Sequence, residues 1–283
     1  MSDPDGRLTS DFYSARSRAF FQRLLSLISG EPRDLLEFDE VREKLHLGGP
    51  IYKGLQTVPL DKVIGSVDRY HDFDREFLPT QSHTADRWYR INRAWYQEIH
   101  LPPVLLYKVG EVYFVVDGNH RVSVARAQGQ LYIDAEVREC RARVPVTEGT
   151  RAEDLERLGD RVEFLERTRL DQLRPAVQIE TTLLGGYDRL VEHIAVHRYF
   201  MGIDLQREVS EQEAVTHWLD SLYQPVVDVV EKSGILDEFP GRTAADVYLW
   251  VMDHLHYLRS EAHQAKIGIS EAAEDFVDRA RED

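Results

Sequence analysis

This 283-residue chain has little cysteine and no long apolar run. The single cysteine, Cys140, excludes an internal disulfide framework and any zinc site built from several cysteines. No apolar run is long enough to span a bilayer. Residues 1–10 are polar and acidic, unlike a signal or transit peptide. We therefore expect a protein of a bacterial-type cytoplasm with no membrane partner.

Lys and Arg are also fewer than Asp and Glu, and almost all of this difference lies in the second half of the chain. The net charge is −15 at pH 7. Residues 1–150 carry 20 Lys and Arg against 22 Asp and Glu, whereas residues 151–283 carry 15 against 28. An acidic surface repels polyanions, so this pattern disfavours nucleic acid as a partner without excluding it. Any phosphate contact is expected in the first half, and the acidic half is interpreted as a scaffold, regulator or interface.

What the chain does contain is a succession of helical and strand patterns. Helices are predicted over residues 11–30, 35–45 and 84–99, the first on an apolar stripe of Phe20, Leu24, Leu27 and Ile28. Strands are predicted over residues 58–64, 104–108, 112–116 and 132–139. Later helices are clearest at 214–230, kinked at Pro225, and at 243–260. We divide the chain into an N-terminal helical segment (1–54), a sheet domain (55–145) and an acidic, mostly helical domain (146–283).

The most informative segment joins the apolar run Val112–Val116 to a helix through Asp117 and Gly118. The first N–H groups of a helix have no internal partners and lie at the positive end of its dipole. Glycine lets a ligand approach that backbone, and a guanidinium grips phosphate oxygens in a fork. We predict a phosphate-binding turn made by Gly118, Asn119, His120 and Arg121. The alternative is a structural turn in which Asp117 caps the helix and Arg121 pairs with an acid.

Three sequence blocks in this order resemble the ParB/sulfiredoxin superfamily. They are Val58-Pro59-Leu60-Asp61-Lys62-Val63, Leu101-Pro102-Pro103-Val104-Leu105, and Asp117-Gly118-Asn119-His120-Arg121 followed by Ala127-Gln128-Gly129. The resemblance covers residues 55–140 and implies an α+β fold with a small mixed sheet, preceded by helices and followed here by a mostly helical domain. It also implies a nucleotide at the turn: CTP in ParB proteins, ATP in sulfiredoxin, an adenine nucleotide in free serine kinases. The turn is most similar to the free serine kinase form.

The chain departs from that superfamily at three places. Asn119 stands where sulfiredoxin has its catalytic cysteine, so sulfinic-acid reduction is not expected. The third ParB block, Glu-Asn-x-x-Arg, has no match downstream. An acidic helical region replaces the DNA-reading helix-turn-helix of ParB. That region, above all Phe239 to Leu258, weakly resembles an uncharacterised bacterial domain.

A polar segment after the first block supplies further candidates. Gly65 and Ser66 would offer backbone and hydroxyl donors, and Arg69 or Arg75 a second cationic contact. The alternative is a solvated loop with local ion pairs. Catalytic candidates are Asp117, as a general base or magnesium contact, and a nearby carboxylate that activates a substrate hydroxyl, drawn from Asp72, Asp74 and Glu76.

Arginines also recur every three residues on the 84–99 helix, at Arg87, Arg90 and Arg93. Such spacing is typical of the solvated face of an amphipathic helix. The alternative is that these arginines follow phosphate groups.

The sequence thus predicts a nucleotide-binding protein with a regulatory role. Its ligand would be ATP, ADP or CTP, with Mg²⁺ as an optional companion, and no resident metal is predicted. The helical domain is expected to associate with itself or with a partner. Two alternatives stay open: a phosphotransferase of the free serine kinase type, and a ParB-like DNA-binding regulator.

Overall fold

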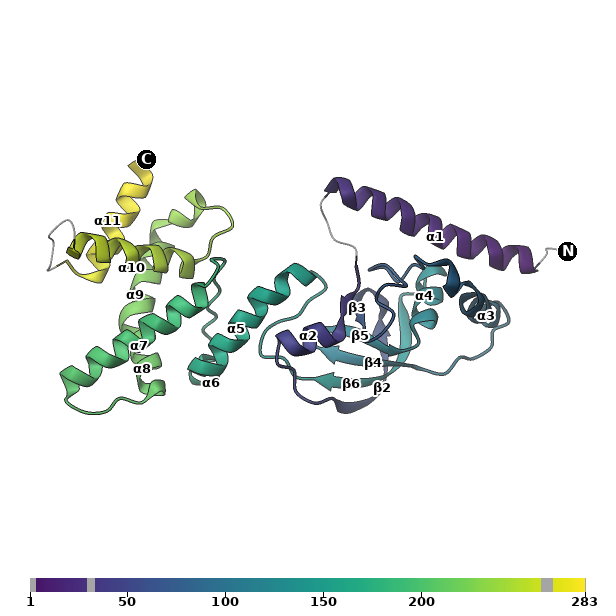
Figure 1. Cartoon of the computed structure of the whole chain (residues 1–283), viewed down its shortest axis with the longest axis horizontal. Coiled ribbons are helices and arrows are strands. Elements are labelled where there is room, and N and C mark those ends of the chain that lie inside the picture. The colour runs from purple at the N-terminus through teal and green to yellow at the C-terminus, as the bar shows by residue number, and fades with distance from the viewer. Residues whose placement is uncertain (1–3, 30–33, 261–266, 283) are drawn as a thin grey trace. The chain divides into compact units, whose positions relative to one another are not determined.

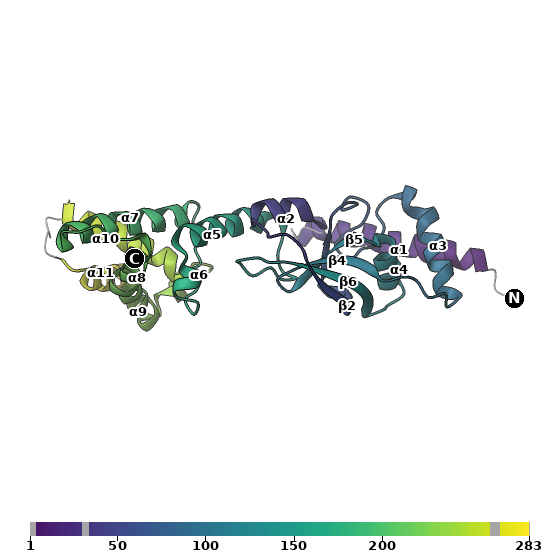
Figure 2. The ribbon, with the colours of Figure 1, turned by 90° about the horizontal axis from the view of Figure 1, so that it is seen from below.

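The computed structural model describes residues 4–29, 34–260 and 267–282. The chain forms two compact units, Met1–Leu158 (unit 1) and Gly159–Asp283 (unit 2) (Figure 1). The described strands all lie in unit 1, whereas the described elements of unit 2 are helical (Figure 2). The predicted α+β class, a mixed sheet followed by a helical region, is confirmed. The division falls within helix α5.

A six-stranded mixed sheet of order β1-β3-β5-β4-β6-β2 is the centre of unit 1. The predicted hairpin is present, because β4 pairs antiparallel with β5 around Gly110, which has φ 57°. Strand β3 lies parallel to both β1 and β5, β6 lies parallel to β4, and β2 closes the other edge antiparallel to β6. The strands are β1 Leu36–Glu37, β2 Ile51–Pro59, β3 Val63–Ser66, β4 Val104–Val109, β5 Val112–Asp117 and β6 Tyr132–Cys140.

The predicted N-terminal helical segment, residues 1–54, is not purely helical. It contains β1 and the first part of β2, so it belongs to the sheet. The helix predicted at 35–45 shrinks to α2 (Phe38–Lys44), because the residues before it pair with β3.

The first helix, α1 (Pro4–Ser29), turns a different face inward from the one predicted. It buries Leu8, Phe12, Ala15 and Ala19, while Phe20 and Leu24 are exposed. The two alanines have short side chains that allow the helix to approach its neighbours closely. The structure describes only the backbone of Leu27 and Ile28, so their side chains lie outside the described part. The predicted helix end at Gly30 and Pro32 also lies outside the described residues.

Helices cover both faces of the sheet. Helix α4 (Asn119–Ala127) packs Val122 and Ala125 onto one face, and α1 and α3 (Ala85–Tyr96) pack against α4 (Figure 1). The fully buried Trp88 of α3 donates a hydrogen bond to the Ser123 hydroxyl of α4 at 3.0 Å. On the other face, the Phe38 ring of α2 lies 4.7 Å from that of Tyr107. Helix α4 is therefore held between the sheet and a helical layer.

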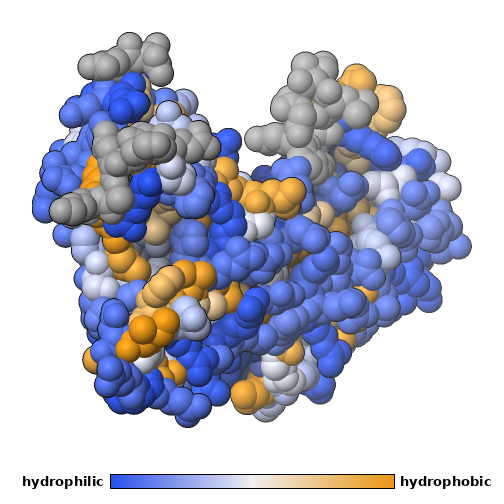
Figure 3. Space-filling model, turned by 60° about the vertical axis from the view of Figure 1, so that its left-hand side comes forward, coloured by the Kyte–Doolittle hydropathy of each residue, from blue (hydrophilic) through white to orange (hydrophobic). Residues whose placement is uncertain are grey.

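Unit 2 is a helical bundle with an aromatic core. The buried Trp218 donates its indole N–H to the Tyr248 hydroxyl at 3.0 Å, and the Tyr223 ring lies 5.0 Å from that of Tyr248. Hydrophilic side chains cover most of the face in Figure 3, interrupted by a strip of hydrophobic ones. The helices are α5 Leu155–Thr168, α6 Leu170–Leu173, α7 Gly186–Leu205, α8 Glu211–Trp218, α9 Gln224–Ser233, α10 Ala244–Ser260 and α11 Ile269–Glu282.

Two local sequence features shape the helices of unit 2. Pro225 lies in the first turn of α9, directly after a π-helical turn at Leu219–Tyr223. Proline lacks an N–H and clashes with the carbonyl four residues earlier, so the helix widens there. Thr243 and Asp246 form a reciprocal cap on α10: the Thr243 N–H donates to the carboxylate at 3.0 Å, and the Asp246 N–H donates to the hydroxyl at 3.2 Å.

Candidate functional site

The turn between β5 and α4 depends on Gly118. Its φ is +109°, and an added Cβ would lie 2.5 Å from Val104 Cγ1, so a larger residue is excluded on both counts. Among the described residues, no side chain caps the helix that begins at Asn119. Asp117 is therefore not the cap that the structural alternative required. The first N–H groups of α4 lie at the positive end of the helix, and the residues that carry the turn, Gly118, Asn119 and His120, are themselves buried.

Asn119 and Ser66 face each other in the buried layer behind this turn. The Ser66 hydroxyl donates to the Asn119 side-chain oxygen at 2.9 Å, and both residues are buried. Gly65 is buried too, and a Cβ there would lie 2.5 Å from the Leu36 carbonyl oxygen. The structure thus brings the predicted Ser66 and Asn119 together. They anchor α4 to β3 rather than line an open surface.

Arg121 is bound by the protein itself. Its guanidinium donates to the carbonyl oxygens of Pro102 and Pro103, at 2.5 and 2.8 Å, and to the Asp117 carboxylate at 2.6 Å. Only 13% of the Arg121 side chain is exposed, against 64% of Asp117. The arginine ties the turn to the segment before β4. This is the ion pair of the structural alternative, so a phosphate fork at Arg121 would first have to release these partners.

His120 is the buried member of the turn. Its ring packs edge-on against Phe73 with centroids 5.3 Å apart, and its Nδ1 has no hydrogen-bond partner within the described ranges. Burial, together with the charges of Arg87 and Arg69, lowers the pKa of His120 to about 4, whereas Asp72 opposes them. The imidazole is therefore neutral at pH 7, with an unused polar atom.

The charges that act on His120 mark a cationic cluster, which we define as Arg69, Arg87 and Arg90. Arg69 donates to Asp72 at 3.0 Å. Arg87 and Arg90 are exposed and make no hydrogen bond or ion pair with any other described residue. Unpaired guanidinium groups beside an uncapped helix N-terminus are suited to bind an anion. Both arginines are exposed, as expected for the solvated face of α3, and the alternative that they follow phosphate groups stays a prediction.

Arg75 and Glu76 are not brought to the turn. The Arg75 guanidinium donates to two carbonyl oxygens, of Glu148 and Thr150, both at 2.7 Å, and burial lowers its pKa to about 10. The Arg75 carbonyl accepts from Arg126, in the last turn of α4, at 3.1 Å. Glu76 accepts from Gln22 of α1 at 2.8 Å. Both residues lie near the opposite end of α4, because the loop after β3 runs along the helix away from its N-terminus.

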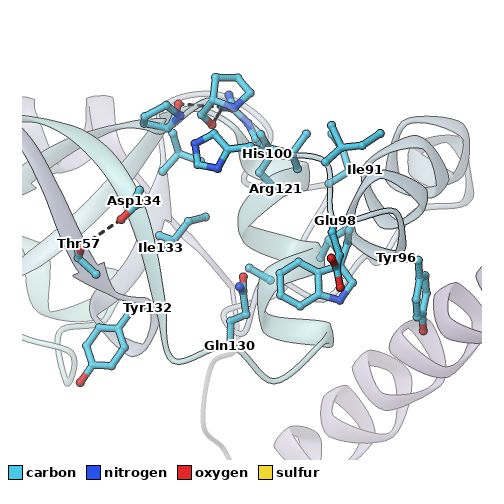
Figure 4. Close-up of a pocket in the computed structure, with 18 residues that line it drawn as sticks. Thr57, Ile91, Tyr96, Glu98, His100, Arg121, Gln130, Tyr132, Ile133 and Asp134 are labelled. Carbon is cyan, nitrogen blue, oxygen red and sulfur yellow. Dashed lines mark hydrogen bonds between the residues drawn. The ribbon is translucent and has the colours of Figure 1, made fainter.

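A groove of about 690 Å³ flanks α4 on the side of Arg121 (Figure 4). Its walls come from the end of α3 and the segment after it, from α4, and from β6. In Figure 4 the side chains of His100 and Gln130 point into the groove opposite Ile133. The apolar lining residues are Ile91, Trp95, Ile99, Leu101, Pro102, Pro103, Val104, Val124, Ala125 and Ile133.

The sequence contained a signal for this groove, an apolar stripe on the predicted 84–99 helix. The apolar stripe of the 84–99 helix includes Trp88, Trp95 and Ile99, but only Trp88 is fully buried. The end of the stripe lines the groove instead.

The described residues contain neither a cluster of metal ligands nor a helix that could cross a membrane. No three His, Cys, Asp or Glu side chains in those ranges are grouped so as to hold a metal ion. None of the helices in the described part of the chain has the length and apolar character needed to cross a membrane.

Comparison with known proteins bears on unit 2 alone. Residues 187–280 match the family described as a domain of unknown function (DUF4032). This match covers α8 to α10 and most of α7 and α11, and it leaves the site in unit 1 outside. No curated protein matches the chain.

Proposed function

We propose that unit 1 binds the phosphate groups of a nucleotide at the N-terminus of α4. The observation that carries the proposal is the pair of unpartnered arginines, Arg87 and Arg90, beside an uncapped helix start. The resemblance of the turn to nucleotide-binding members of the ParB/sulfiredoxin superfamily supports a nucleotide over a simpler anion. We infer a cytoplasmic setting, where nucleotides are abundant, and a regulatory role.

In this proposal the backbone and the cationic cluster make different contacts with the phosphate groups. Backbone N–H groups of the first turn of α4 donate to phosphate oxygens, and Arg69, Arg87 and Arg90 neutralise their charge. Neutral His120 adds a hydrogen bond through Nδ1. Arg121 keeps the turn in shape and does not grip the phosphate. Asp117, exposed at the rim, is the candidate contact for a Mg²⁺ ion that accompanies the nucleotide.

The groove is the candidate site for the nucleoside half of the ligand. It starts at Arg121, in the first turn of α4, and its volume of about 690 Å³ suits a small organic ligand. Its walls are about evenly polar and apolar, with His100 and Gln130 among the polar contacts, and they favour a flat, partly polar ring. The carboxylates of Glu98 and Asp134 also line the groove. Among the open alternatives, a phosphotransferase would have to use Asp117 or Asp72 as its catalytic carboxylate, because Glu76 lies near the other end of α4.

The test is a thermal-shift series with ATP, ADP, CTP and GTP, each with and without Mg²⁺. A ligand at about a hundred times its dissociation constant adds about 2.7 kcal/mol to the free energy of unfolding. We expect one nucleotide to stabilise the wild-type protein and to lose this effect in the double variant Arg87→Ala/Arg90→Ala.

Arg93→Ala is the matched control. It removes the same charge from the same helix, but Arg93 is not among the groups that act on His120. The control should keep the ligand-induced shift. A folded wild-type protein that responds to none of the nucleotides would overturn the proposal, and so would equal losses in the control and the double variant.

A further inference from the structure

The C-terminal half of α7 points an apolar face away from unit 2. Val196, Tyr199, Phe200 and Ile203 are each more than half exposed. Their spacing of i, i+3, i+4 and i+7 places them on one side of the helix. The same helix buries Tyr187, Leu190 and Ile194 earlier in its length. Its first half is therefore packed into unit 2, whereas this face of its second half is exposed. We call these four exposed residues the α7 strip.

A groove of about 710 Å³ borders the α7 strip. It follows α7 for about three turns, from Val191 past Ile194 to Ile203, and its opposite wall includes Val209 and Val215. A channel of this length beside an apolar helix face fits another helix, whose large side chains it can receive. An exposed apolar patch of this kind marks a protein interface.

The charge pattern indicates that the partner helix comes from a second copy of the chain. Residues 193–203 contain no Asp or Glu, although unit 2 is strongly acidic. Two copies of the chain would repel each other wherever their carboxylates meet. Contact through the α7 strips would bring no carboxylates of residues 193–203 together. Glu192 lies one turn before the strip, and Arg207 lies directly after α7, where it pairs with Glu213 of the same chain. Antiparallel pairing would bring Glu192 of each copy towards Arg207 of the other.

We propose that the chain forms a homodimer through the α7 strips of two copies, packed antiparallel about a two-fold axis between Tyr199 and Phe200. Such an interface is self-complementary, since Val196 of one copy meets Ile203 of the other. The aromatic rings lie at the centre, where buried anchors contribute most to association. This dimer lies in unit 2 and does not depend on nucleotide binding.

The first test is the molecular mass of the full chain in solution, by sedimentation equilibrium over a range of protein concentrations. We expect a dimer, and a monomer for Phe200→Glu, because a carboxylate would enter the centre of the interface. Tyr257→Glu is the matched control, since Tyr257 is an exposed aromatic residue of α10 in the same unit. It should remain dimeric. A monomeric wild-type protein, or a dimer that survives Phe200→Glu, overturns the proposal.

The second test reads the direction of the helices. Under mild oxidation, Phe200→Cys should form a disulfide-linked dimer, because the two copies of residue 200 lie beside the axis. Glu192→Cys should not. At 1.5 Å of helix per residue its two copies are about 22 Å apart, far beyond disulfide reach. The native Cys140 is buried and does not compete. Equal cross-linking of both variants would indicate parallel helices and overturn the proposed arrangement.

Discussion

The Ser66 hydroxyl donates to the side-chain oxygen of Asn119 across 2.9 Å, in a fully buried layer of unit 1. This single bond joins the end of β3 to the first residue of α4. The position of the uncapped helix N-terminus relative to the sheet therefore depends on two side chains that do not reach the ligand surface.

Ser66→Ala should lower the free energy of unfolding by about 1–3 kcal/mol, because it leaves the buried Asn119 oxygen unpaired. In Asn119→Ala the Ser66 hydroxyl still has the Val115 carbonyl at 3.2 Å, so the loss should be smaller. Urea unfolding of both variants and of the double variant checks this. A double variant whose loss equals the sum of the two would contradict direct coupling.

Arg121→Lys should destabilise the turn more than Asp117→Asn does. Lysine has no planar fork and cannot serve two carbonyls and a carboxylate together, so we expect a loss of about 2 kcal/mol. The Asp117 contact is largely exposed, and its loss should cost under about 1 kcal/mol. Chemical denaturation measures both. Equal losses would mean that the carboxylate, and not the carbonyls of Pro102 and Pro103, holds the guanidinium.

Gly118→Ala should cost more than Gly129→Ala, although both glycines have positive φ. At Gly129, with φ +75°, nothing lies within 4 Å of an added Cβ, so only the backbone penalty of about 1–2 kcal/mol applies. At Gly118 the added atom would also meet Val104 at 2.5 Å. Thermal unfolding compares the two. Equal melting temperatures of the two variants would show that β4 shifts to accommodate the new methyl group.

Acidification should destabilise the wild-type protein through His120. Burial, with the charges of Arg87 and Arg69, lowers the folded-state pKa of His120 to about 4, below its ordinary value of 6.5. The unfolded chain therefore binds the proton more readily, and stability is lost as the pH falls from about 6.5 to about 4. His120→Gln should flatten the unfolding free energy over that window. An unchanged pH profile in the variant would assign the acid sensitivity to other groups.

The same imidazole offers a readout of ligand binding. An anion beside His120 favours its protonated form, so a bound phosphate group should raise the pKa of His120. The ring resonances of His120, followed by NMR across the same pH range with and without nucleotide, measure this. A pKa that does not rise with saturating nucleotide would place the phosphates away from His120.

Part of the site was predictable because it is local. Gly118 ends β5 and starts α4 through its own backbone conformation, and the hairpin before it needs only Gly110 and its flanking strands. The apolar stripe ending at Trp95 and Ile99 was visible too. Hydrophobic periodicity identifies such an apolar face without telling what covers it, so the groove that the stripe lines was not predictable.

The sequence by itself determined the strand–turn–helix at Gly118, the α+β class, the cap on α10 and the acidic second half. All of these depend on neighbouring residues or on composition. Only the tertiary structure decided which arginines are available. Arg121 meets two carbonyls that sheet pairing brings to it, whereas Arg87 and Arg90 are left unpaired beside the helix start. A guanidinium takes the acceptors that lie within its reach, and those acceptors come from segments distant in the chain.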